Sequence, residues 1–215
     1  MNPLHDAVWI NEPRRHEISD HFVRIVTDPQ TDLWQRSYYG FRNDNAPGLL
    51  LESAENFTFT VSVRFSYRRQ FDQCGLLIYQ DADSWFKASV EYESADFSRL
   101  GSVVTNHGHS DWATTDIDTP SEIRYRLSRR GPDFLVESSR DGGTDDGGFT
   151  QMRVFHLHCL GESTAEMGRS DPPLPPDRPV RFGVYACSPL DASFECVFDE
   201  LRLESCLWES HAHEG

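Results

Sequence analysis

The stretch that decides the fold runs from Phe71 to Trp112 and reads FDQCGLLIY (71–79), WFKASVEYE (85–93), GSVVTN (101–106) and SDW (110–112). Short apolar and β-branched runs follow one another here, separated by polar turns, which is typical of consecutive β-strands. Strand side chains alternate between two faces, so residues 85–92 divide into two sets. The alternation predicts a core face of Phe86, Ala88, Val90 and Tyr92, and an opposite, polar face of Trp85, Lys87, Ser89 and Glu91.

The same alternation extends to both sides of this stretch. In residues 57–67 six successive odd positions are apolar and the even positions are polar, which a helical period does not fit. We expect the polar face of this strand to lie in solvent or in a groove. Further strands are predicted at residues 21–27, 123–128, 134–139, 152–157, 180–187 and 194–203, with a hairpin turn at 131–133.

About ten to thirteen strands without interleaved helices predict an all-β fold, namely a two-sheet antiparallel β-sandwich or jelly roll. No linker with a composition shift on both sides interrupts the pattern. We therefore expect a single domain over residues 1–215, with a core at about 5–203 and a polar tail at 204–215 that frays. The Pro-rich segment 171–179 is predicted to be neither helix nor interior strand, because proline lacks an N–H donor.

The composition argues against several classes of function. The chain has 215 residues, with 35 acidic against 20 basic side chains and a formal net charge of -15. This balance argues against nucleic-acid binding, which needs a basic surface, and against docking on an anionic membrane. No apolar run has the length of about 20 residues that spans a bilayer, and the N-terminus lacks the features of a signal peptide, so we expect a cytoplasmic protein. The five cysteines include no Cys-x-x-Cys pair and are predicted to be buried, reduced thiols.

The order and spacing of several motifs resemble the family named after regulation of enolase protein 1, a family of largely unknown function. The motifs are DQCGL (72–76), WFK (85–87) followed by Glu91, SVVT (102–105), SDW (110–112), Arg126, SRDG (139–142), Arg153 and FGVYACSP (182–189). The resemblance covers about residues 5–203 and implies a concanavalin A-like sandwich. Two departures are Cys74, where the family commonly has alanine, and the acidic Gly-rich loop 141–148, where an aromatic residue usually follows the hairpin.

The polar face of the central sheet is the first candidate site. Aromatic rings beside planar polar groups are suited to sugars, because a sugar has both apolar ring faces and hydroxyl groups. The alternative is an exposed sheet face with cross-strand ion pairs and packed tryptophans. The candidate ligand-binding residues are Gln73, Trp85, Lys87, Glu91, Asn106, Asp111, Trp112, Arg126 and Arg153.

Catalytic and metal sites are weaker candidates. Glu91 and Glu93 share a strand face at a spacing that permits glycoside hydrolysis, although Glu93 falls at the strand end. Two histidine clusters and an acidic loop contain ligand types for zinc or calcium, but none has a known ligand spacing. We therefore predict no metal site and no cofactor; the clusters are His107, His109 and Asp111, then His156 and His158, and the loop is 141–146.

Three functions follow from these candidates. The first is binding of a saccharide or a sugar-derived metabolite in a cleft on the concave sheet face. The second is regulation of a metabolic enzyme by protein contact, which the family name implies. The Pro-rich segment 171–179 could serve as a ligand for such a partner, although a rigid connector is the favoured interpretation of this segment. The third is glycoside hydrolysis through Glu91, although the sequence favours a protein that is not an enzyme.

Overall fold

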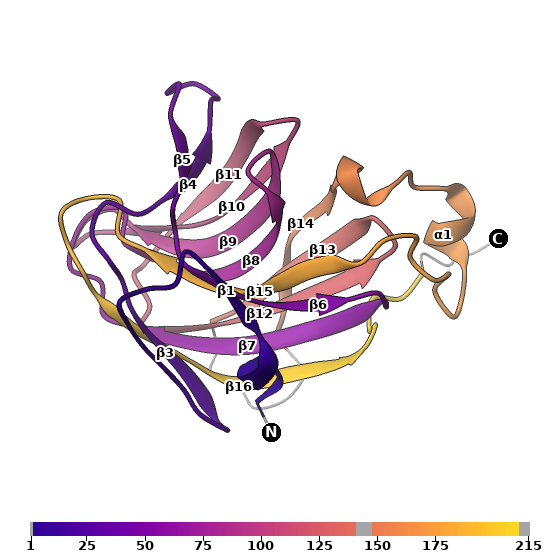
Figure 1. Cartoon of the computed structure of the whole chain (residues 1–215), viewed down its shortest axis with the longest axis horizontal. Coiled ribbons are helices and arrows are strands. Elements are labelled where there is room, and N and C mark those ends of the chain that lie inside the picture. Colours follow the sequence, from indigo (N-terminus) through magenta and orange to yellow (C-terminus); the bar gives the residue numbers. More distant parts are fainter. Residues whose placement is uncertain (1, 141–147, 211–215) are drawn as a thin grey trace.

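Two antiparallel sheets of seven strands each make up most of the part of the chain that the structure describes, residues 2–140 and 148–210 of a computed structural model (Figure 1). The all-β, two-sheet sandwich predicted from the sequence is confirmed. The first sheet has the order β1-β6-β15-β8-β9-β10-β11. Its strands are β1 (Val8–Ile10), β6 (Gly48–Ser53), β8 (Gln73–Asp81), β9 (Ser84–Tyr92), β10 (Ser98–Asn106), β11 (His109–Ile117) and β15 (Val180–Cys187).

The second sheet has the order β14-β13-β12-β7-β16-β3-β2, and a separate hairpin, β4-β5, stands apart from both sheets. Figure 1 shows this hairpin projecting beside the curved strands β8 to β11. The strands of the second sheet and the hairpin are β2 (Arg15–Ile18), β3 (Phe22–Val26), β7 (Phe57–Phe65), β12 (Glu122–Arg130), β13 (Asp133–Ser139), β14 (Thr150–His156), β16 (Glu195–Ser205), β4 (Leu33–Gln35) and β5 (Arg42–Asp44). The helical elements are short: η1 (Pro3–Asp6), η2 (His158–Leu160) and α1 (Ala165–Arg169).

The core lies between the two sheets and follows the predicted alternation. Phe86, Ala88 and Val90 of β9 are buried in it, opposite the apolar side chains of β7. The polar face of β7 differs from the expectation, because Thr58 and Ser62 are buried too. Since β7 is the central strand of its sheet, these hydroxyls hydrogen-bond to the neighbouring strand β12: Thr58 to the Ser128 hydroxyl at 2.8 Å, and Ser62 to Glu122 at 2.7 Å.

The segments outside the predicted strands are also fixed. Residues 171–179 form neither helix nor strand, as predicted, and Asn56 Nδ2 donates to the Leu174 carbonyl at 2.7 Å. Strand β16 continues to Ser205, and the Leu207 N–H donates to Thr58 Oγ1 at 2.8 Å, so the first part of the expected fraying tail is anchored. The five cysteines are free thiols, and the predicted burial is confirmed for Cys74, Cys187 and Cys196. Among the described residues, we find no helix with the length and hydropathy of a bilayer span.

Candidate functional site

A cleft of about 570 Å³ opens on the face of the first sheet that points away from the core. Its floor comes from β8, β9, β10 and β11, and one wall comes from the β4-β5 hairpin. Residues 71 and 189–190 close the other side. The lining residues are Asp32, Trp34, Tyr39, Phe41, Asn43, Phe71, Gln73, Lys87, Ser89, Glu91, Arg99, Gly101, Ser102, Val103, Trp112, Pro189 and Leu190.

A buried lysine marks the floor. Lys87 is 5% exposed, and its Nζ lies 3.2 Å from Asp32 Oδ1, which comes from the segment just before β4. Burial by itself lowers the pKa of an ammonium group, but Asp32, Cys187 and Glu91 outweigh it and hold the pKa of Lys87 above its ordinary value. The floor therefore carries a paired, charged lysine.

Glu91 lies two residues further along the same strand face. Burial raises its pKa to about 7; Lys87 opposes this rise and Asp32 adds to it. Gln73 Nε2 donates to Glu91 Oε2 at 2.7 Å, and the Tyr185 hydroxyl donates to Gln73 Oε1 at 2.9 Å. This chain of hydrogen bonds fixes both the amide and the carboxyl group. At neutral pH Glu91 can therefore either donate or accept a hydrogen bond in the cleft.

Aromatic rings form the wall above this floor. Trp34 and Trp112 meet edge to face with ring centroids 6.3 Å apart, and Tyr39 meets Trp34 at 5.5 Å. Tyr39 and Phe41 lie almost parallel, with centroids 5.4 Å apart and planes 10° apart. The cleft thus combines a hydrogen-bonding floor with a continuous apolar wall.

Several hydrogen bonds fix the hairpin that carries the wall, among them those from the Tyr79 hydroxyl of β8 to the Asp44 carboxylate of β5 at 2.9 and 3.0 Å. The Gln35 N–H donates to Ser110 Oγ at 2.9 Å, and Arg36 Nη1 donates to Asp83 Oδ1 at 3.0 Å. Asn43 Nδ2 donates to Asp32 Oδ2 at 3.2 Å, so the aspartate that pairs with the floor lysine also holds β5. The wall is therefore attached to the first sheet at its base.

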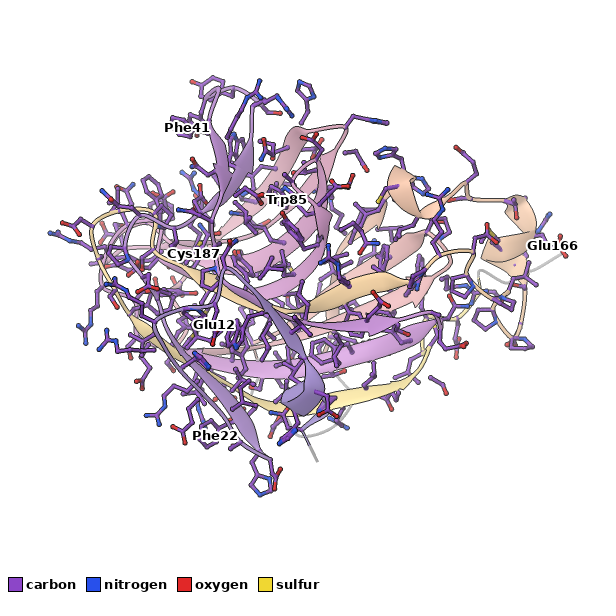
Figure 2. The ribbon with its side chains drawn as sticks, in the orientation of Figure 1. Glu12, Phe22, Phe41, Trp85, Glu166 and Cys187 are labelled. Atoms are coloured by element: carbon purple, nitrogen blue, oxygen red, sulfur yellow. The ribbon has the colours of Figure 1, made fainter. Side chains whose placement is uncertain are left out.

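The structure brings four of the predicted binding residues together in the cleft: Gln73, Lys87, Glu91 and Trp112. Trp85 shares their strand face but is 0% exposed, because it belongs to a second buried apolar cluster that also contains Leu33 and Ala46 from the base of the hairpin. It is a packed tryptophan and does not line the cleft. Figure 2 labels Trp85 in the body of the sheet and Phe41 on the projecting hairpin.

The remaining predicted residues do not reach the cleft. Val104 of β10 pairs with Asp111 on one side and with the core residue Phe86 on the other, so Asp111 points to the core face, opposite Lys87. Asn106 lies two positions after Val104 on β10 and therefore points to the same face as Asp111. Arg126 lies on the second sheet and pairs with Glu137 at 2.7 Å. Asp111 forms an ion pair with Arg153 of β14, and Asn106 Nδ2 donates to the His156 carbonyl at 2.9 Å.

The structure also places the two members of the predicted carboxylate pair apart from each other, and likewise the two members of the predicted histidine pair. Glu93 lies beyond the end of β9, pairs with Arg99 at 3.1 Å and does not line the cleft with Glu91. His158 lies on η2 and not in a strand. Its ring contacts the His107 ring in a tilted arrangement, with centroids 3.5 Å apart and planes at 30°, whereas His156 Nδ1 contacts Asp133 at 2.9 Å. Over residues 2–140 and 148–210, no three His, Cys, Asp or Glu side chains are placed to hold a metal ion. The acidic loop 141–146, the weak candidate for calcium, lies outside the described residues.

Most of the wall was not predicted from the sequence. None of its hairpin residues is among the candidate site residues named there. The density of Trp34, Tyr38, Tyr39 and Phe41 within eight residues was the available signal. Only the tertiary structure shows that this segment folds over the polar face of β9.

Comparisons with known proteins agree with the fold and with the resemblance noted in the sequence. A family model described as "Protein of unknown function (DUF1349)" matches residues 9–206. The chain is 37% identical over 111 residues to regulation of enolase protein 1 of Saccharomyces cerevisiae; the matched region is 52% of this chain and 55% of that protein, about half its length. A crystal structure of a functionally unknown protein from Saccharomyces cerevisiae matches with a TM-score of 0.78 and 27% identity, over 95% of this chain and 99% of the other.

More distant structures share the sandwich. A GH43 protein from Bacillus licheniformis matches with a TM-score of 0.60 and 14% identity, over 86% of this chain and 33% of that chain. A xylan β-1,4-xylosidase from Bacillus halodurans gives a TM-score of 0.59 at 11% identity, again over 86% and 33%. At these identities the similarity establishes the fold alone.

Proposed function

Because this chain belongs to the DUF1349 family of proteins of unknown function, we propose its function from the cleft itself: it binds a saccharide or a sugar-derived metabolite. One observation carries the proposal, namely that an aromatic wall faces a floor of hydrogen-bonded polar groups. A sugar ring presents apolar C–H faces to aromatic rings and hydroxyl groups to amides and carboxyls. Trp112 of β11 supplies an aromatic ring, while Gln73 and Glu91 supply the polar partners.

The charges of the cleft favour a neutral ligand. The Lys87 ammonium is already paired with Asp32, and the Arg99 guanidinium is paired with Glu93. A phosphate or uronate would compete with Asp32 or Glu93 for these cations and would approach the Glu91 carboxyl, which disfavours a second negative charge nearby. We therefore expect neutral sugars to bind more tightly than sugar phosphates.

The test is titration calorimetry of the purified protein with neutral sugars, neutral oligosaccharides and sugar phosphates. Binding should weaken in Trp112→Ala and Glu91→Gln. It should persist in Glu166→Gln, a matched carboxyl change on α1, at the opposite end of the molecule in Figure 2. If no saccharide binds at millimolar concentration, the proposal is wrong, and the name of the yeast relative then directs the search to protein partners such as enolase.

A second candidate, glycoside hydrolysis, is favoured by the Glu91 pKa of about 7, which is suited to a general acid near neutral pH. The other carboxyl group of the floor, Asp32, is engaged by Lys87 and Asn43. Hydrolysis of chromogenic glycosides by the wild type, abolished in Glu91→Gln, would establish this activity. Binding of intact saccharides without turnover would support binding alone.

A further inference from the structure

The cleft does not end at the polar floor. The same continuous cavity that includes Glu91 and Lys87 is lined by Tyr39 and Phe41 near the tip of the β4-β5 hairpin. Tyr39 is 50% exposed and Phe41 is 52% exposed. Figure 2 shows Phe41 on the part of the hairpin that projects from the sandwich. The cavity therefore runs from a buried polar end to an open aromatic end.

The aromatic end is held in place before any ligand binds. Tyr39 and Phe41 lie parallel within 10°, and Tyr39 rests against Trp34, which itself meets Trp112. The Trp34 Nε1–H donates to the Ser37 carbonyl at 2.9 Å and so fixes the base of the tip. Half-exposed rings that are rigidly held lose little conformational freedom when they bind a partner, which is the property of good contact residues.

The two ends of the cavity differ in chemistry. The floor carries Lys87, Asp32 and Glu91, whereas Tyr39, Phe41 and Leu190 at the mouth offer mainly apolar surface. A single small sugar that is hydrogen-bonded to the floor would leave the exposed rings at the mouth uncovered. An oligosaccharide can fill both ends of the cavity, because one sugar unit can bind the polar floor while the next unit stacks on the aromatic rings at the mouth.

We infer, on the basis of the proposed function, that the ligand is a neutral oligosaccharide of at least two units, and that Tyr39 and Phe41 form an outer aromatic subsite for the second unit. Tyr38 provides the internal comparison. It lies at the same tip and meets Tyr39 edge to face at 4.8 Å, but it is 95% exposed and does not line the cavity. Truncating Tyr38 therefore removes an exposed ring from the hairpin without removing the subsite.

The experiment is calorimetry with glucose and xylose and with their β-1,4-linked oligomers of two to five units. We expect the Kd of the wild type to fall about tenfold from one unit to the longer oligomers, consistent with one additional stacked ring. Tyr39→Ala and Phe41→Ala should each remove most of this gain, so that their Kd for the longer oligomers approaches their Kd for the monosaccharide. Urea unfolding with a midpoint close to that of the wild type shows that each variant is folded. Tyr38→Ala should keep the gain.

Equal affinity for monosaccharides and oligomers would overturn the outer subsite and leave the proposed function standing. An equal loss in Tyr38→Ala and Tyr39→Ala would also overturn it, since the effect would then not depend on lining the cavity. If none of these probes binds to the folded wild type, both the proposed function and this inference are wrong.

Discussion

Replacing Glu91 with glutamine should stabilise the protein at neutral and alkaline pH and leave its stability in acid nearly unchanged. The folded state raises the pKa of Glu91 from 4.5 to about 7, chiefly by burial. A raised pKa means that the folded state holds this proton more tightly than the unfolded state. The resulting contribution to stability is present below pH 4.5 and is lost as the pH rises through about 7.

The size of the effect follows from the shift. A rise from 4.5 to about 7 corresponds to roughly 3 kcal/mol of unfolding free energy, as an upper value for a partly exposed carboxyl group. Glutamine has no proton to lose and can still accept the hydrogen bond from Gln73 Nε2. Above pH 8, the unfolding free energy of Glu91→Gln should therefore be higher than that of the wild type by up to about 3 kcal/mol.

Urea unfolding at intervals between pH 4.5 and pH 8.5 measures this difference directly. All other ionisable groups are common to both proteins, so the difference between the two curves isolates Glu91. Glu166→Gln on the exposed helix α1 controls for the loss of one surface carboxyl and should run parallel to the wild type. If the Glu91→Gln and wild-type curves also run parallel across this range, Glu91 is not perturbed and the floor is more open to water than its contacts indicate.

Three further predictions concern the floor and the wall. Lys87→Met should lower the unfolding free energy by about 3 kcal/mol in urea titrations, because Asp32 loses its partner in a partly buried site; adding Asp32→Asn should recover part of the loss. Trp85→Ala should lower it by about 3–5 kcal/mol, since a fully buried indole is removed; a change below about 1 kcal/mol would contradict its role as a packed side chain. Arg36→Ala should increase hydrogen exchange within residues 33–44 and leave the two large sheets protected, because its contact with Asp83 anchors only the hairpin.

The floor of the cleft was predictable because it depends on one local rule. Alternation along β9 places Lys87 and Glu91 on one face and Phe86 on the other, and the structure keeps that division. The same rule predicts the face to which a side chain points, but it does not predict how deeply that side chain is buried. Trp85 has the same parity as Lys87, yet it is buried in a cluster that includes Ala46 and Leu33, residues about 40 and 50 positions earlier in the chain. No pattern within β9 could have distinguished the two positions.

Parity in the neighbouring strands removes two candidates once the register between β9, β10 and β11 is known. Trp112 pairs with Val103, which pairs with Lys87, so these three residues lie on the cleft side. Asp111 and Asn106 have the opposite parity and therefore face the second sheet. Arg126 is a different case, because its exclusion depends on the assignment of β12 to the second sheet, which no local sequence pattern specifies.

The wall of the cleft depends on several long-range contacts, and one of them joins the hairpin directly to the floor. Asp32 accepts a hydrogen bond from Asn43 of β5 through one carboxylate oxygen, and pairs with Lys87 of the floor through the other. The hairpin and the floor are therefore joined by the same group that neutralises the lysine. Because the pair is buried, moving the hairpin away would expose or unpair Lys87 and would be opposed by several kcal/mol. This coupling explains why a short two-stranded hairpin, which is marginal in isolation, can stand away from the sandwich and still hold its aromatic rings in place.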